Sequence, residues 1–232
     1  MLPSYRLEPI IHLDKQQIAW AELLFGATPG PSLPNSVVEW RKWYQMLPLL
    51  VEEALSESSF EMVAVNVDTV HLLDSTIRDS FGKLASYPVM VEWTERRDQQ
   101  VGRIEVDEAG DYLVSIARDC GFKIALDDMG AGEDAMTRLV ALLRNGNPDV
   151  IDVIKIDGPF FQACRSCEHV EQVLRLYIAM FSELGISTCI EWIETPNDLE
   201  LAQSLGACWG QGYYWRPEPL GQLLLETRCA HG

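Results

Sequence analysis

The chain has 232 residues, of which 47% are hydrophobic, and its formal net charge is −17. A chain of this length can bury a large core in one domain, and we expect a single domain over 1–232. So acidic a surface excludes binding along the backbone of a nucleic-acid polymer, which needs a basic stripe, and no apolar run is long enough for membrane insertion.

The first elements expected along the chain are a pair of strands. The segment "IIHLDKQQIAWAELLFGA", residues 10–27, has two apolar runs around a polar stretch at Asp14–Gln17, which predicts two strands joined by a turn. Next, the amphipathic pattern over 36–58 predicts a helix, in which Pro48 should cause a break or a kink.

Strands and helices then alternate. Most strand runs are continuously apolar, as in strands buried on both faces: Glu61–Val67, Pro88–Thr94, Phe122–Asp128, Asp149–Asp157 and Ile186–Ile193. Amphipathic helices are expected over 69–86, 103–120, 133–145, 169–184 and 197–205, and a last short strand near Cys208–Trp215. No glycine-rich dinucleotide-binding motif follows the first strand, so the pattern favours a closed TIM-like β/α barrel, of the α/β class, over an open sheet.

The cysteines give no metal or disulfide pattern. Six are scattered along the chain, and the pair in "CRSC", Cys164–Cys167, has no second pair to complete a zinc site. We expect this pair at the start of a helix, as structural or incidental thiols. The start of the chain also lacks a basic segment followed by an apolar core, so the reducing cytoplasm is the expected compartment.

Polar residues stand at the carboxyl ends of successive predicted strands. They are Glu22, Asn66, Glu92, Glu95, Asp127, Asp128, Lys155, Asp157, Glu191, Glu194 and Gln211. In a β/α barrel these ends converge on one face, where active sites are built. Clustered carboxylates with an amide and no histidine or thiolate are hard oxygen ligands, which suit magnesium, manganese or calcium.

The adjacent pair Asp127 and Asp128 can bridge two cations, whose positive charge removes the repulsion between the carboxylates. Two such ions activate water for in-line displacement at phosphorus. Lys155 either orients that water and meets charge on the phosphoryl oxygens, or forms a salt bridge within the acid cluster, and both roles are compatible. Gly130 and Gly132 allow a tight loop after the aspartates.

At these residues the sequence resembles the EAL-domain family, bacterial phosphodiesterases that act on cyclic di-GMP. The resemblance runs from about Tyr5 to about Leu225 and covers seven motifs in order: "ELL" at Glu22–Leu24, "VAVNVD", "EWTE", "DDMGAG", "VIKID", "IEWIET" and "GQGYYWRP". It implies a β/α barrel with one antiparallel N-terminal strand, and hydrolysis of cyclic di-GMP to linear pGpG with two Mg²⁺ or Mn²⁺ ions.

The resemblance also implies residue roles. One metal would be held by Glu22, Asn66, Glu92 and Asp127, and a second by Asp127, Asp128 and Glu191. Lys155 would position or help deprotonate the attacking water, Glu95 would stabilise the loop after Asp128, and Glu194 and Gln211 would support the site at its rim. Gln211 and Leu24 are expected at the substrate.

The sequence departs from the family pattern in several places. Gly26 stands where the family has an arginine that contacts substrate phosphate, and Met129 stands where it has a phenylalanine. Trp192 replaces a glycine, so that its ring either crowds the second metal or points away. The segment from Asp128 to Lys155 is longer than usual, and in the family this region shapes the contact of a homodimer, which is one expectation here.

These departures leave two other functions open. The first is a non-catalytic EAL-like module that binds cyclic di-GMP as a sensor or another protein as an adaptor. The second is an unrelated metal-dependent hydrolase on a barrel. Retention of the full set of acids, the amide and the lysine favours the metal-dependent phosphodiesterase.

Overall fold

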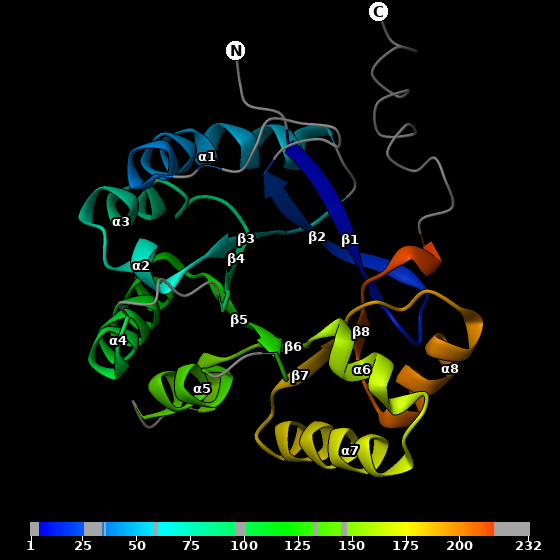
Figure 1. Ribbon diagram of the computed structural model, residues 1–232. Coiled ribbons are helices and arrows are strands. Elements are labelled where there is room, and N and C mark those ends of the chain that lie inside the picture. Colours follow the sequence, from blue (N-terminus) through cyan, green and yellow to red (C-terminus); the bar gives the residue numbers. More distant parts are fainter. Residues whose placement is uncertain are drawn as a thin grey trace, which may run out of the picture.

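The computed structural model describes residues 5–25, 34, 36–57, 60–95, 101–131, 134–144 and 148–215. Eight strands in these ranges close into a barrel in the order β1 to β8 (Figure 1). They are β1 (Tyr5–His12), β2 (Gln17–Phe25), β3 (Val63–Val67), β4 (Val89–Trp93), β5 (Lys123–Met129), β6 (Val153–Ile156), β7 (Ser187–Ile190) and β8 (Trp209–Gly210). Strand β1 is antiparallel to both neighbours, β2 and β8, whereas the neighbouring pairs from β2 to β8 are parallel. The predicted TIM-like barrel with one antiparallel N-terminal strand is confirmed.

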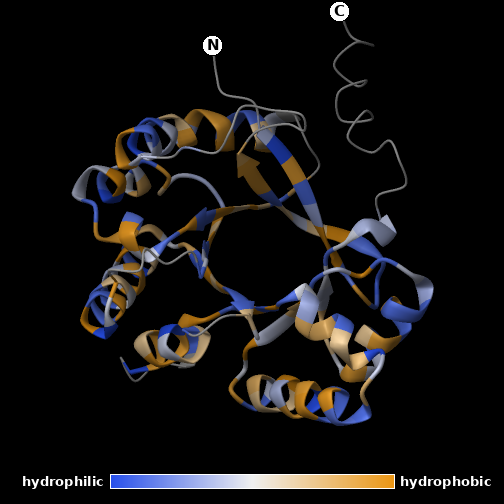
Figure 2. Ribbon diagram, in the orientation of Figure 1, coloured by the Kyte–Doolittle hydropathy of each residue, from blue (hydrophilic) through white to orange (hydrophobic). Residues whose placement is uncertain are grey.

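Helices surround the strands (Figure 1). They are α1 (Val37–Glu57), α2 (Thr69–Leu72), α3 (Ser75–Gly82), α4 (Arg103–Cys120), α5 (Ala135–Leu143), α6 (Gly158–Cys164), α7 (Glu168–Glu183) and α8 (Pro196–Leu205), with short 3₁₀ turns at Pro148–Val150 and Tyr213–Trp215. Hydrophobic residues lie along the strands and along the helices that pack on them (Figure 2), and the main core fills the space between these two layers. Among the described residues, no helix has both the length and the apolar character needed to cross a bilayer.

The hairpin β1–β2 sets the geometry of the first site residues. Its register places Glu8 opposite Glu22 and Arg6 opposite Leu24. The predicted pair of strands is confirmed, but β1 begins at Tyr5 and not near Ile10. Residues 5–9 pair with β2 although the apolar run starts only at Ile10. Pairing with the neighbouring strand therefore decides where β1 begins.

The break predicted at Pro48 does not occur. Helix α1 runs from Val37 to Glu57 with Pro48 inside it. Leu47, Leu50 and Val51 on either side of the proline are buried in the main core. Burial of this apolar face therefore offsets the loss of one backbone hydrogen bond.

The single helix predicted over 69–86 is two helices. The Asp74 side chain accepts a hydrogen bond from the backbone N–H of Ile77 at 3.1 Å and so caps α3. Its carboxylate also binds the Arg41 guanidinium, with Nη2 of Arg41 2.7 Å from Oδ2. Asparagine and aspartate compete with helical backbone in this way, and the competition ends α2 and starts α3.

Helix α6 was not predicted, and its presence corrects the place of the cysteine pair. Cys164 is the last residue of α6, and Cys167 is the residue that precedes α7. Asp157 starts α6 by accepting a hydrogen bond from the N–H of Phe160, and Pro159 follows in the first turn, a position where its missing N–H is harmless. The run "GPFFQAC" is too short for its helical period to stand out in the sequence.

Candidate metal centre

Side chains inside the barrel form two stacked layers. The layer furthest from the strand carboxyl ends is apolar and consists of Ile10, Trp20, Ala64, Met90, Ala125, Val153 and Cys189. Since side chains alternate along a strand, the residue two positions nearer the carboxyl-end mouth also points inward. That step leads to Glu22, Asn66, Glu92, Asp127, Lys155 and Glu191, and, because β1 runs the other way, to Glu8. Six of the predicted strand-end residues thus belong to a single polar layer of the barrel.

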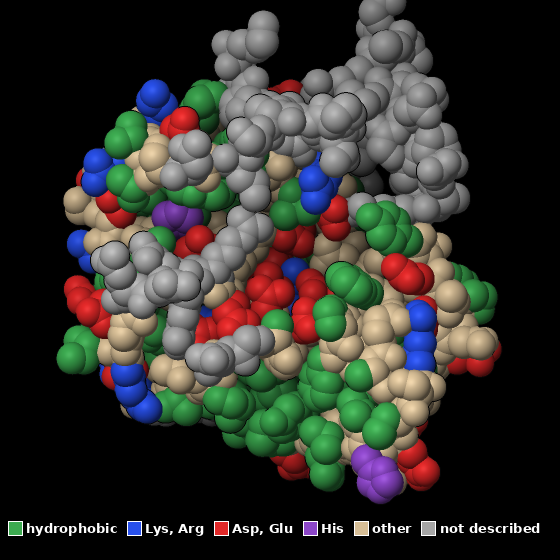
Figure 3. Space-filling view, viewed as in Figure 1, with side chains coloured by type: hydrophobic (Ala, Val, Ile, Leu, Met, Phe, Trp, Pro, Cys, Tyr) green, Lys and Arg blue, Asp and Glu red, His purple; other side chains and the backbone are tan. Residues whose placement is uncertain are grey.

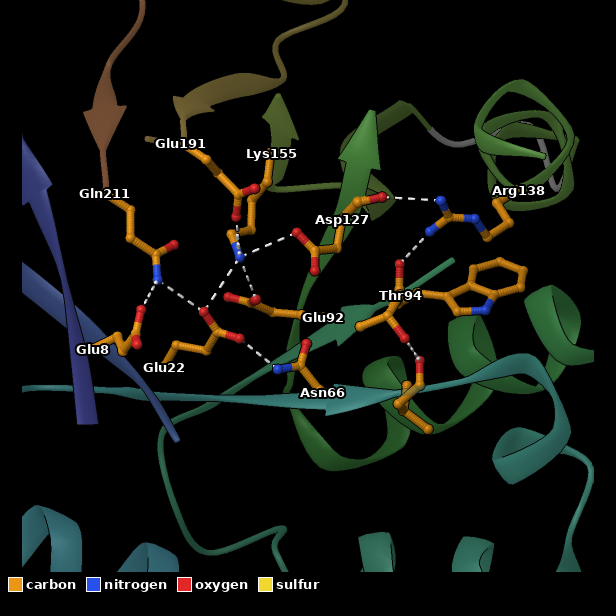
Figure 4. A network of polar contacts seen from close by, with 12 residues as sticks. Glu8, Glu22, Asn66, Glu92, Thr94, Asp127, Arg138, Lys155, Glu191 and Gln211 are labelled. Atoms are coloured by element: carbon orange, nitrogen blue, oxygen red, sulfur yellow. Dashed lines mark hydrogen bonds and ion pairs between the residues drawn. The ribbon is translucent and has the colours of Figure 1, made fainter. Parts of the chain in front are cut away.

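Lys155 lies at the centre of this polar layer (Figure 4). Its Nζ lies 2.9 Å from Glu92 Oε2, 2.9 Å from Glu191 Oε1, 3.1 Å from Asp127 Oδ1 and 3.4 Å from Glu22 Oε2. The ammonium is almost completely buried. The salt-bridge role considered for this lysine is therefore real, and it draws together four carboxylates from four strands.

Amide groups fix the carboxylates on the β1–β2 side. Asn66 Nδ2 donates to Glu22 Oε1 at 2.5 Å, and Gln211 Nε2 donates to Glu22 Oε2 at 2.9 Å. The same Gln211 nitrogen lies 3.2 Å from Glu8 Oε2 (Figure 4), and Arg6 Nε donates to the other Glu8 oxygen at 3.0 Å. Glu8 was not predicted to be part of the site. The hairpin register identifies it, because it pairs directly with Glu22.

One ammonium cannot neutralise four buried carboxyl groups, and the pKa values follow from this imbalance. Burial raises the pKa of three carboxyl groups, and the neighbouring acids reinforce the effect. The pKa of Glu92 lies well above its ordinary value, that of Asp127 is raised, and that of Glu191 is raised to about 8. Lys155 opposes each of these shifts. Burial also acts to raise the pKa of Glu22, but Lys155, Gln211 and Asn66 together hold it below the ordinary value. Burial acts to lower the pKa of Lys155, and the surrounding carboxylates raise it well above the ordinary value, so the lysine is charged.

We expect the free energy of unfolding of the metal-free protein to fall as the pH rises from about 4.5 to about 8, the ordinary and folded pKa values of Glu191. In this window the folded state keeps a proton that the unfolded state has released, so the unfolded state binds fewer protons and stability decreases with pH. Urea unfolding in EDTA at several pH values measures the slope. Glu191→Gln should reduce it, and a slope that is unchanged in this variant would exclude Glu191 as its source.

The oxygen donors fit a divalent cation. One ligand atom from each of Asp127, Asp128 and Glu191 lies within 4.8 Å of the others. In the described part of the chain, Asn66 Oδ1 and Glu92 Oε1 are buried without a hydrogen-bond partner. Buried acceptors of this kind are costly unless a donor or a cation meets them. Carboxylate and amide oxygens without nitrogen or sulfur are the donor set of Mg²⁺, Mn²⁺ or Ca²⁺.

The backbone after Asp127 turns sharply. Asp128 has φ = 59°, in the left-handed region, and its carbonyl accepts from the N–H of Ala131 at 3.1 Å. Gly130 follows with φ = 105°, and a Cβ there would lie 2.3 Å from Phe160 Cδ1, so only glycine fits. The tight loop predicted after the aspartates is confirmed as far as Ala131, whereas Gly132 lies outside the described residues.

Three other predicted residues lie away from Lys155. Glu95 follows β4, and its Oε1 lies 3.5 Å from the backbone N–H of Asp134 at the start of α5, beyond the aspartate loop. The Glu194 side chain is exposed, and its backbone N–H donates to Asp198 at 3.0 Å. Leu24 lies on β2, two positions beyond Glu22 on the same face.

Arg138 is a buried arginine that the sequence did not single out. From α5 it donates to the backbone carbonyl of Asp127 at 3.0 Å and to that of Trp93, at the carboxyl ends of β5 and β4 (Figure 4). Its Nε donates to Asp134 Oδ1 at 3.2 Å, and both side chains are fully buried. Arg138 thus fixes the strand end that carries Asp127, from the outside of the barrel.

The polar layer opens into a pocket of about 200 Å³. Its lining consists of Glu8, Glu22, Asp127, Lys155, Glu191, Trp192, Gln211, Gly212 and Tyr213. In the space-filling view this pocket is an acidic hollow with a buried basic group in it (Figure 3). Trp192 does not displace Glu191 from the cluster, because Glu191 Oε1 is 2.9 Å from Lys155 Nζ. Its ring lines the pocket and leaves the Glu191 carboxylate in place.

The chain is similar in sequence to one set of known proteins and similar in fold to solved structures. A probable cyclic di-GMP phosphodiesterase, PdeG of Escherichia coli strain K12, is 28% identical over 160 residues, which is 66% of this chain and 29% of that protein. This chain thus spans less than a third of that relative. The structure of an EAL domain protein from Listeria monocytogenes EGD-e matches with a TM-score of 0.76 at 17% identity, over 98% of this chain and 93% of that one.

A second solved structure, that of Klebsiella pneumoniae BlrP1, matches with a TM-score of 0.74 at 18% identity, over 92% of this chain and 55% of that one. At these identities the two structures support the fold alone. The family sequence model described as "EAL domain" matches residues 49–218. This range contains Lys155 and six further residues of the candidate metal centre: Asn66, Glu92, Asp127, Asp128, Glu191 and Gln211. On this match, the chain belongs to the EAL domain family.

Proposed function

We propose that this protein is a metal-dependent phosphodiesterase that hydrolyses cyclic di-GMP to linear pGpG and so lowers the level of a bacterial second messenger. The observation that carries the proposal is the convergence of four carboxylates from the carboxyl ends of four strands on one buried lysine, with amides from the ends of β3 and β8 bound to one of them. The relative PdeG is named a probable cyclic di-GMP phosphodiesterase, and the BlrP1 structure is a complex with manganese and cyclic di-GMP.

In this proposal the protein would hold two Mg²⁺ or Mn²⁺ ions, and Asp127 would belong to both sets of ligands. Glu22, Asn66 and Glu92 would complete one set, and Asp128 and Glu191 would complete the other. When bound, the cations would polarise the attacking water and the phosphoryl oxygens. The buried acceptor oxygens of Asn66 and Glu92 support this ligand set, because a cation would satisfy them.

Lys155 is assigned a positioning and electrostatic role. Because the surrounding carboxylates keep it charged in the metal-free protein, it is poised to donate hydrogen bonds to the water and to developing charge on the phosphate. Water adds to phosphorus, the bond from phosphorus to the 3′ oxygen breaks, and that oxygen takes up a proton. The product is then a 5′-phosphate with a free 3′-hydroxyl, as in pGpG.

The remaining roles are proposals of the same kind. Glu95 holds the loop after Asp128 through its contact near Asp134. Gln211 and Leu24 face the substrate, and Glu194 supports the rim. The 232 residues form a single EAL domain that acts in the cytoplasm, where the five cysteines in the described part of the chain remain free thiols. Its partner is the cyclic dinucleotide and not a nucleic-acid polymer, which the net charge of −17 would repel.

A homodimer is also proposed, with α5 as part of the contact. Met136 and Val140 expose 49% and 43% of their surfaces on this helix. Exposed apolar groups on one helix face favour a protein contact. Sedimentation of the wild-type protein and of a Met136→Glu variant measures it. A dimer is expected only for the wild type, and a monomeric wild type would exclude the contact.

We expect Asp127→Asn to reduce kcat by about 10³-fold or more, because this residue belongs to both proposed ligand sets. Formation of pGpG is followed by chromatography with Mg²⁺ and with Mn²⁺. Asp119→Asn, which changes an exposed aspartate at the end of α4, is the matched control and should keep the wild-type rate.

The same assay separates the other functions. Binding of cyclic di-GMP by the wild type without turnover in either metal would favour a sensor. A protein with neither binding nor turnover would favour an adaptor. Wild-type turnover in Asp127→Asn would remove this residue from the ligand sets.

A further inference from the structure

A large aromatic side chain lies exposed at the rim of the pocket. Trp192 directly follows Glu191 and exposes 52% of its surface. It lines the pocket together with Tyr213, which is 66% exposed. Hydrophobic side chains border the acidic hollow in the space-filling view (Figure 3). An indole at this place offers a flat apolar face beside the polar layer.

The backbone holds this indole in place. Trp192 has φ = 58°, a left-handed conformation that is rare and unfavourable for a bulky residue. The residue before it is tied to β6, since the N–H of Glu191 donates to the carbonyl of Ile156 at 3.2 Å. The carbonyl of Trp192 accepts from Gln162 Nε2 at 2.8 Å. Such strain, maintained by its surroundings, is typical of functional positions.

The ring itself rests on a glycine. A Cβ on Gly158, at the start of α6, would lie 2.2–2.5 Å from the Cγ, Cδ1 and Cδ2 atoms of Trp192. The indole therefore lies directly on the backbone of α6, and the missing side chain of Gly158 makes room for it. One side of the ring is supported, and its exposed surface borders the pocket.

We propose that Trp192 is a stacking platform for one guanine base of the cyclic dinucleotide, an inference that rests on the proposed function. The pocket of about 200 Å³ is smaller than the roughly 300–1,000 Å³ that encloses a whole small-molecule ligand. A dinucleotide whose phosphate reaches the carboxylates must extend over the rim, where the indole is exposed. Stacking of a base on an aromatic ring corresponds to about 10- to 100-fold in affinity.

The first test compares two replacements of the ring. Trp192→Leu keeps apolar bulk without an aromatic face, and Trp192→Phe keeps an aromatic face. Cyclic di-GMP is titrated by calorimetry in Ca²⁺, and the same samples are checked for pGpG, so that binding and turnover are recorded separately. We expect the Kd to rise about 10- to 100-fold in Trp192→Leu and by less than about threefold in Trp192→Phe.

The second test leaves the ring intact and moves it. Gly158 lies outside the left-handed region, so alanine fits its backbone, but the new methyl group would push the indole away. Gly158→Ala should weaken binding in the presence of Trp192 and have no further effect in the Trp192→Leu background. This double-mutant cycle isolates the contribution of the ring position. Thermal melting of each variant confirms that it is folded.

The outcomes separate the two proposals. Wild-type affinity in Trp192→Leu, or equal effects of Gly158→Ala in both backgrounds, overturns the platform and leaves the proposed hydrolysis intact. Absence of binding by the wild type overturns both. Binding that weakens in Trp192→Leu while the wild type shows no turnover supports the platform and overturns only the hydrolysis.

Discussion

Replacing Arg138 by methionine is expected to lower the free energy of unfolding by about 3–5 kcal/mol. The guanidinium is fully buried, and it binds the carboxylate of Asp134 and the carbonyls of Trp93 and Asp127. Methionine fills most of the volume but offers no donor, so buried acceptors lose their partner. Urea unfolding followed by circular dichroism measures the change.

The matched control lies six positions further on. Arg144→Met removes an arginine at the end of α5 that pairs with Asp107 and Asp111 at the surface. It should cost only about 0–1 kcal/mol, because solvent screens these pairs. An equal loss in Arg138→Met and Arg144→Met would contradict the role assigned to Arg138.

Lys155→Met is expected to abolish turnover and to lower the metal-free free energy of unfolding by about 3–5 kcal/mol. Without the ammonium, the carboxylates of Glu22, Glu92, Asp127 and Glu191 face one another with no positive charge between them. The loss should be larger at pH 8 than at pH 5, because carboxyl groups with raised pKa values can stay protonated at the lower pH.

The effect of divalent cations on the Tm of Lys155→Met tests this prediction further. Mg²⁺ or Mn²⁺ should raise the Tm of Lys155→Met by more than that of the wild type, since the cations would supply the charge that the lysine supplied. Lys123→Met, at the exposed start of β5, changes the net charge equally and should respond as the wild type does. The same rise in Tm for all three proteins would place the cations elsewhere.

The barrel and most of the polar layer could be predicted because they obey local rules. Apolar runs of strand length recur between amphipathic stretches, and each run ends in an acid or amide. Parallel strands bring those ends together whatever the details of packing. That is why the sequence located Asn66, Glu92, Asp127 and Glu191, which the structure gathers around or beside Lys155.

The parts that escaped prediction depend on tertiary contacts. Glu8 lies before the apolar run of its strand, and only pairing with Glu22 brings it to the layer. Arg138 looks like one of the charged residues of an exposed helix face, but two of its three partners are backbone carbonyls, which leave no trace in a sequence. The orientation of Trp192 depends on a glycine 34 positions earlier in the chain, at Gly158.

Because an apolar layer lies beneath a polar layer, the site depends on which residues of each strand face the lumen and which face the helices. Inserting one residue between Ala125 and Asp127 would turn the aspartate out of the lumen and toward the helices, whereas inserting two would only raise it by one level. Length can therefore vary in the connecting loops, whereas an odd insertion within a strand has to be absorbed by a bulge, as the register shift between Leu126 and Met129 does in β5, if the oxygen atoms are still to meet.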